Sequence, residues 1–87
     1  DIILIEALKD YVIIHTNEGK FTVHSTMKDI EKKFDFDNFH RIHRSFIINI
    51  NKIKSIEHSN IVLEGYNKEI PIGGSYRDDL NNKIKQV

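Results

Sequence analysis

The segment FHRIHRSFIINI, residues 39–50, decides how this chain folds. Aromatic and branched apolar residues dominate it, as is typical of a β-strand. If it were one unbroken strand, the alternation of side chains would place Arg44 on the same face as Phe46 and Ile48. Because an unpaired guanidinium group is costly to bury, we expect a turn or bulge near residues 43–45 that directs Arg44 to solvent.

The overall composition also favours a mainly β fold. Ile occurs 16 times among the 87 residues, whereas Ala occurs once. Because β-branched side chains fit pleated sheets better than helix interiors, we expect few and small helices. The length suits a single domain over residues 1–87. Since the chain starts in an apolar run without an initiator Met, we interpret it as a fragment of a longer protein.

Short antiparallel strands joined by tight turns are expected along most of the chain. The first three form a meander, with a turn at residues 9–10 and a second turn in which Gly19 takes a positive φ. Pro71 lacks an N–H donor, which predicts that the last strand lies on a sheet edge. The expected strands are residues 2–7, 11–16, 20–24, 39–50 with the interruption described above, 53–57, 61–64 and 69–72.

One helix is predicted between the meander and residue 39. Met27, Ile30 and Phe34 recur at helical spacing, which predicts a helix over about residues 27–34. Thr26 precedes it and is a suitable N-cap.

A second helix is predicted at the carboxyl end of the chain. Tyr76, Leu80 and Ile84 lie four residues apart, which predicts a helix over about residues 75–86. We expect Ser75 to be its N-cap.

Charge is balanced overall but unevenly distributed. The 13 Lys and Arg residues equal the 13 Asp and Glu residues, which argues against a uniformly basic nucleic-acid binder or a generic binder of anionic membranes. Residues 38–56, however, contain four basic side chains and no acidic one. Arg41 and Arg44 have planar guanidinium groups that suit phosphate or guanine recognition, so one interpretation is that this segment presents donors to a polyanion. The alternative is an ordinary solvated strand face whose cations pair with Glu64 or Glu69.

A second candidate anion site lies at the start of the terminal helix, at residues 73–77 (GGSYR). Two glycines let the backbone approach a ligand closely, and the free N–H groups of a helix start favour an anion. The alternative is a plain strand-to-helix turn. The first hairpin turn, residues 9–11 (KDY), is a weaker candidate, because most such turns are solvated connections.

Metal binding and catalysis find little support in the sequence. The chain has no Cys, and His40 and His43 are three residues apart, which on a strand points them to opposite faces. No nucleophile elbow, HExxH motif or phosphate-binding loop is present. We therefore expect no enzyme activity, metal, cofactor or small-molecule substrate. We also predict neither a signal peptide nor a membrane span, and the cysteine-free composition fits a cytoplasmic protein.

Residues 39–49 (FHRIHRSFIIN) resemble the signature of the LytTR DNA-binding domain family. In that signature an aromatic residue, an Arg, a His-Arg-Ser triplet, a second aromatic residue and an apolar-apolar-Asn run follow one another at this spacing. The flanks match as well, from an apolar-Glu-Ala strand at residues 5–7 to an Ile-Pro-Ile strand at residues 70–72 followed by Gly, Ser and Tyr76. The resemblance covers essentially residues 2–84.

The resemblance implies the output domain of a bacterial two-component response regulator, which binds double-stranded promoter DNA as a transcriptional regulator. It also implies an elongated arrangement of short antiparallel β-sheets. Family members bind direct repeats by inserting loops, rather than a recognition helix, into successive grooves. Since the isolated domain has no net charge, affinity would depend on correctly placed loops and on a homodimer formed through the rest of the full-length protein.

Three DNA-contacting segments follow from the resemblance. The loop of residues 9–11 would enter one major groove, His43 and Arg44 would approach the adjacent backbone or minor groove, and residues 73–77 would enter the next major groove. In the last segment many relatives have basic residues at two positions that are Gly and Ser here, so base reading would fall to Arg77 or to backbone N–H groups. The predicted DNA-binding residues are Lys9, Asp10, Tyr11, Arg41, His43, Arg44, Ser45, Gly74, Ser75 and Arg77.

A different class of function is the alternative. A small β-rich module could bind a protein partner through an edge strand near Pro71, or through exposed Ile side chains, without contacting nucleic acid. A gel shift with direct-repeat DNA distinguishes the two functions.

Overall fold

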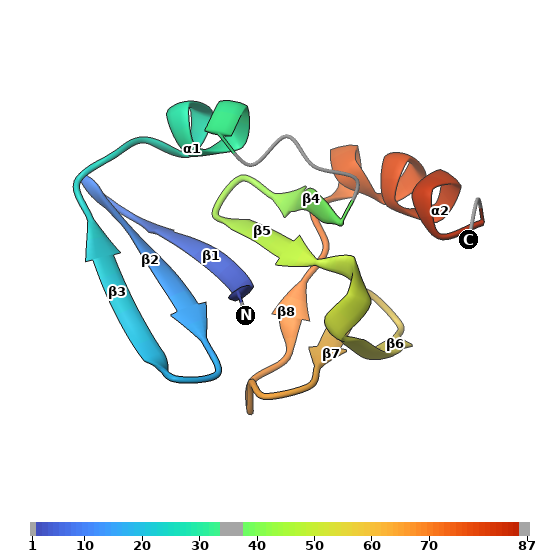
Figure 1. Cartoon of the computed structure of the whole chain (residues 1–87). Helices are drawn as coiled ribbons and strands as arrows, with labels where there is room; N and C mark the ends of the chain where they lie inside the picture. The colour runs from blue at the N-terminus through green and yellow to red at the C-terminus, as the bar shows by residue number, and fades with distance from the viewer. Residues whose placement is uncertain (1, 34–37, 86–87) are drawn as a thin grey trace.

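Two antiparallel β-sheets form the framework of the chain (Figure 1). The computed structural model describes residues 2–33 and 38–85. The first sheet has five strands in the order β3-β2-β1-β5-β4, and the second has three strands in the order β6-β7-β8. The strands are β1 (Ile2–Leu8), β2 (Tyr11–Thr16), β3 (Gly19–Val23), β4 (Phe39–His43), β5 (Phe46–Asn49), β6 (Ile53–Glu57), β7 (Asn60–Leu63) and β8 (Ile70–Pro71).

Short helical elements connect or follow these strands. The α-helices are α1 (Met27–Lys33) and α2 (Arg77–Lys85), and the 3-10 turns are η1 (Ile50–Lys52) and η2 (Gly74–Tyr76). Within the described residues, neither α-helix has the length and apolar character needed to cross a bilayer. The Cα trace measures 33 × 24 × 20 Å, so the molecule is elongated in one direction.

The strands predicted from the sequence are confirmed to within one residue at each end. Pro71 lies in β8 at an edge of the second sheet, and Gly19 has a φ of +141° at the β2–β3 turn, as expected. α1 begins where it was predicted. Its expected last residue, Phe34, and the expected helix end at residue 86 lie outside the described residues.

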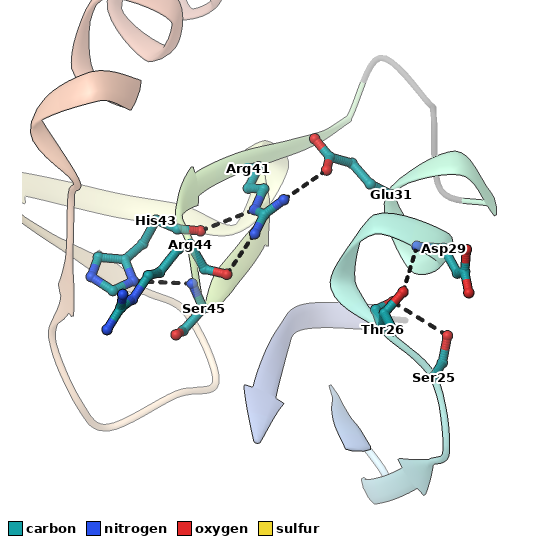
Figure 2. A network of polar contacts seen from close by, with 8 residues as sticks. All are labelled: Ser25, Thr26, Asp29, Glu31, Arg41, His43, Arg44 and Ser45. Carbon is teal, nitrogen blue, oxygen red and sulfur yellow. Dashed lines mark hydrogen bonds and ion pairs between the residues drawn. The ribbon is translucent and has the colours of Figure 1, made fainter. Parts of the chain in front are cut away.

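The side chain of Thr26 caps α1. Its hydroxyl oxygen accepts a hydrogen bond of 3.1 Å from the backbone N–H of Asp29, three residues on, which satisfies one of the otherwise unpaired donors of the first turn (Figure 2). The N-cap prediction for this helix is confirmed.

The N-cap predicted for the terminal helix is wrong. The helical segment starts as the 3-10 turn η2, and its N-cap is Gly73, which has no side chain to donate or accept. Ser75 therefore lies inside η2, and α2 begins only at Arg77. Sequence periodicity predicted the helix, but it could not separate its α-helical turns from a preceding 3-10 turn, because side chains repeat similarly in both.

Two hydrophobic clusters cover the two faces of the first sheet. Neighbouring residues of β5 point into different clusters, because side chains alternate across a strand. Ile48 packs in the cluster shared with the second sheet and α2, which comprises Ile3, Leu4, Ile42, Ile48, Ile61, Leu63, Ile70 and Leu80. Ile47 packs in the cluster beneath α1, which comprises Ile5, Val12, Met27, Ile30 and Ile47.

Asn49 turns the chain from the first sheet towards the second. Its side chain is buried, donates a hydrogen bond of 2.9 Å to the carbonyl oxygen of Ile2 and accepts one of 3.0 Å from the N–H of Asn51. The first bond ties the end of β5 to the start of β1, and the second caps η1. The Asn that ends the family-like signature thus has a structural role, since it fixes the corner between the sheets.

A polar cluster joins the two sheets near the β7–β8 connection. His15 is buried, and its Nε2 lies 3.0 Å from the carboxylate of Glu6 on the neighbouring strand β1. The ring of Tyr66 packs edge-on against His15, with 5.1 Å between ring centroids. Beside it, Gly65 has a φ of +85° and lies against Ile3. Glycine suits this position, because L side chains rarely adopt such a φ and a Cβ would stand 2.9 Å from Ile3 Cδ1, so that this methyl group would have to shift.

Gly65→Ala is expected to destabilise the domain. The substitution combines a strained positive φ with a steric clash against Ile3, so the free energy of unfolding should fall by about 1–3 kcal/mol. Gly74→Ala is the matched control, because no heavy atom lies within 4 Å of an added Cβ there. Urea denaturation of both variants measures the difference, and equal stabilities would contradict the role given to Gly65.

Burial, and then the negative charge of Glu6, raise the pKa of Tyr66 above its ordinary value of 10.0. In the unfolded chain Tyr66 loses its proton near that ordinary value, whereas in the folded chain it keeps the proton to higher pH. The resulting stabilisation is fully present below pH 10.0 and is lost as the pH rises through the folded pKa. Wild type should therefore lose more stability than Tyr66→Phe in denaturation curves above pH 10.0. If wild type and Tyr66→Phe lost the same stability as the pH rose, the raised pKa of Tyr66 would be contradicted.

Candidate nucleic-acid interface

The segment that decided the fold is an interrupted hairpin. Arg41 pairs with Ile47 across β4 and β5, but His43 pairs with Phe46, so the register shifts between Arg41 and His43. Because of this bulge, Ile42 lies in the buried cluster shared with the second sheet. The ring of His43, the next residue, packs against Phe46. The predicted irregularity is confirmed, although the shift begins before residue 43.

The turn itself consists of Arg44 and Ser45 (Figure 2). Arg44 is exposed, as expected for a cation that the bulge keeps out of the core. The backbone N–H of Ser45 donates a hydrogen bond of 3.1 Å to Nδ1 of His43, whose ring packs against Phe46 with 5.6 Å between centroids. The carbonyl oxygen of Ser45 accepts a bond of 2.8 Å from the N–H of Ala7 in β1.

Arg41 faces inwards, towards the turn and the helices. Its guanidinium group donates to the carbonyl oxygens of His43 (3.3 Å) and Arg44 (2.7 Å) and to the carboxylate of Glu31 in α1 (3.0 Å) (Figure 2). It also lies 5.9 Å from the centre of the Tyr76 ring in η2. Only 22% of the Arg41 side chain is exposed. The expected alternative of pairing with Glu64 or Glu69 is wrong for this residue, since its carboxylate partner comes from α1.

Backbone hydrogen bonds place the β4–β5 turn between the other two predicted segments. The bond from Ala7 to Ser45 ties the turn to the end of β1, which leads into the loop of residues 9–10. On the other side, the N–H of Gly73 donates a bond of 2.7 Å to the carbonyl oxygen of Ile42. The β1–β2 loop, the β4–β5 turn and the β8–α2 segment therefore follow one another across the molecule, from left to right in Figure 1.

The β1–β2 loop presents polar and aromatic side chains to solvent. Lys9 and Asp10 are exposed, and Tyr11 is 48% exposed although it begins a strand. The Tyr11 ring packs edge-on against His24, with 5.1 Å between centroids. The loop therefore presents two charged side chains and one aromatic ring that packs against His24.

The β8–α2 segment is supported from the β6–β7 turn. Arg77 donates a short hydrogen bond to the hydroxyl of Ser59, and the N–H of Ile72 donates one of 2.8 Å to the Ser59 carbonyl. Gly73 must be small here, because a Cβ would lie 2.9 Å from the Tyr76 ring. Gly74 and Ser75 are exposed, with open space around Gly74.

The supporting residues of this interface were not identified from the sequence. Glu31 and Tyr76 contact Arg41 from 10 and 35 residues away in the chain. Ser59 contacts Arg77 from 18 residues away. No local sequence motif encodes such distant contacts. Among residues 2–33 and 38–85 no group of three His, Asp or Glu side chains gathers that could hold a metal ion.

Comparison with known proteins shows the family and the fold of this chain. Residues 1–85 match the family described as the LytTr DNA-binding domain. The chain belongs to the LytTR family. A solved LytTr DNA-binding domain, from a methyl-accepting/DNA response regulator of Bacillus cereus, has a similar fold: the TM-score is 0.83 and the identity 26%, over 95% of this chain and 80% of that chain. The family and the mainly β fold predicted from the sequence are confirmed.

Curated relatives of this LytTR domain are longer proteins. The sensory transduction protein LytT of Bacillus subtilis is 33% identical over 89 residues, and that of Bacillus cereus is 30% identical over 91 residues. The alignments cover 97% and 98% of this chain but 36% of each relative. Membership of the LytTR family assigns the chain to the DNA-binding domains and does not favour a protein-interaction module without nucleic acid.

The tautomer of His43 can be predicted from the interface. Because Nδ1 accepts a hydrogen bond from the N–H of Ser45, the neutral ring should carry its proton on Nε2. Nε2 is then an N–H donor that makes no hydrogen bond to Ser45. Long-range ¹H–¹⁵N correlation spectra distinguish the two ring nitrogens, and a dominant Nδ1–H form would contradict the bond.

Proposed function

We propose that this LytTR domain binds specific sites in double-stranded promoter DNA as the output module of a bacterial two-component response regulator. It acts in the cytoplasm, has no catalytic role and reads DNA through three segments: the β1–β2 loop, the β4–β5 turn and the β8–α2 segment. The observation that carries the proposal is the hydrogen-bonded arrangement of these segments side by side, with Arg44 exposed at the centre.

The order of the three segments across the domain suits contacts in successive grooves. The β1–β2 loop and the β8–α2 segment lie on opposite sides of the β4–β5 turn, so we propose that they enter two neighbouring major grooves on one face of the duplex. The central β4–β5 turn would then lie over the backbone or minor groove between them.

The side chains available on the three segments suit a division of roles. Arg44 and Lys9 would neutralise phosphates, which positions the domain without reading sequence. Tyr11 and Arg77 would approach base edges from the two outer segments, with Asp10, His43, Ser45, Gly74 and Ser75 adding hydrogen bonds through side chains or backbone.

Two copies of the protein are proposed to occupy direct repeats. The domain has no net charge, so general attraction to phosphate is modest, and a second site multiplies the affinity of the first. The alignment covers only 36% of each LytT relative, and by analogy with such longer proteins we propose that the homodimer forms through segments outside this domain.

Selection of bound DNA from a random pool tests the proposal as a whole. Enrichment of spaced direct repeats is the expected result. Failure to enrich any sequence would overturn specific DNA binding and would favour a protein partner instead.

Arg44→Ala is expected to weaken DNA binding about tenfold, on every sequence to a similar degree. If Arg44 meets a phosphate, the slope of log affinity against log salt should also become shallower by about 0.9. Lys68→Ala is the control: this exposed lysine lies near Gly19 and the β2–β3 turn, at the far end of β2 from the interface. Fluorescence anisotropy at several salt concentrations measures both variants. An unchanged slope for Arg44→Ala would exclude the phosphate contact.

A further inference from the structure

The Arg44–Ser45 peptide group is held from both sides. Its carbonyl oxygen accepts a bond of 2.7 Å from Arg41, and its N–H donates one of 3.1 Å to Nδ1 of His43. Because a trans peptide is planar, its carbonyl and N–H point in opposite directions, so the two bonds fix the orientation of the whole unit.

The preceding peptide group is held by the same arginine. The carbonyl oxygen of His43 accepts a bond of 3.3 Å from Nε of Arg41, and the carbonyl oxygen of Ser45 accepts one from β1. The peptide planes on both sides of the Arg44 Cα are thus constrained. Since these two planes set φ and ψ, they also set the direction in which the Arg44 side chain leaves the backbone.

The charge of Arg41 is already matched within the domain. Its guanidinium group forms an ion pair of 3.0 Å with Glu31 and lies over the ring of Tyr76. In Figure 2 the side chain of Arg44 extends away from the guanidinium group of Arg41. A second phosphate-binding arginine at position 41 would have to give up bonds to two carbonyl oxygens and a carboxylate.

We propose that Arg41 is a positioning residue: it contacts no DNA and acts by holding the β4–β5 turn in the conformation that aims Arg44 at the duplex. This inference rests on the proposed function, and it replaces the sequence-based expectation that Arg41 belongs to the contact surface. Pre-organising the turn in the free protein removes an ordering step that would otherwise reduce the affinity.

A double-mutant cycle tests the inference. Arg41→Ala should weaken binding as Arg44→Ala does, by about tenfold, because the side chain of Arg44 is no longer aimed. Added to Arg44→Ala, the Arg41→Ala substitution should cause less than about a twofold further loss and no further change in the salt slope. If Arg41 met a phosphate itself, the losses would add, and the slope would fall by about another 0.9.

Two single variants separate geometry from charge. Arg41→Lys keeps the positive charge but cannot hold two carbonyl oxygens with one planar group, so it should bind as weakly as Arg41→Ala. Glu31→Gln leaves both carbonyl bonds in place and should stay within about twofold of wild type. Retention of wild-type affinity by Arg41→Lys would overturn the inference.

Amide hydrogen exchange in the free domain gives a readout that does not depend on DNA. The Ser45 amide should exchange faster in Arg41→Ala and Arg41→Lys than in wild type, while amides in the centre of β1 keep their protection. Unchanged exchange at Ser45 would overturn the positioning role. Specific DNA binding by wild type is measured separately, so its absence would count against the proposed function alone.

Discussion

The antiparallel pairing of β1 with β5 is the constraint on which the rest of the structure depends. It joins the N-terminal meander to the hairpin of residues 39–49 and sets Ile5 opposite Ile47 and Leu4 opposite Ile48. Each of these pairs faces a different hydrophobic cluster, so a shift of one residue would exchange the two sets of side chains between α1 and the second sheet. The register is therefore fixed by burial on both faces at once.

The same register positions the three segments of the candidate interface. With β1 and β5 aligned, the N–H of Ala7 meets the carbonyl of Ser45, and the β4–β5 turn is held beside the β1–β2 loop. The bulge at Ile42 then lets one hydrophobic residue enter the core while the backbone carbonyl of that residue receives the N–H of Gly73. A packing constraint in the middle of the sheet thus determines where three surface segments lie relative to one another.

Most of the fold could be predicted from the sequence, because it follows from local patterns. Alternation, turn residues and the cap at Thr26 locate the strands and the first helix, and the cost of burying Arg44 predicts the interruption after β4. The function of Arg41 could not be predicted in this way. Its partners lie on α1 and η2 as well as in the adjacent turn, and sequence spacing contains no measure of which helix covers which face. Ser75 is a second example of what the sequence could not predict. Serine is a good capping residue, but here it lies inside the 3-10 turn η2, whose N-cap is Gly73.

The direction of the side chain at position 44 is determined by groups other than that side chain. Arg41 and Ala7 donate to carbonyl oxygens of the turn, and His43 accepts from a backbone N–H; these backbone groups do not depend on the residue type at position 44. Natural variation at this position can therefore change the side chain that the turn presents to solvent while the scaffold stays the same. Domains of this design can vary the charge or length of that side chain through single substitutions, and the rest of the sequence need not adjust.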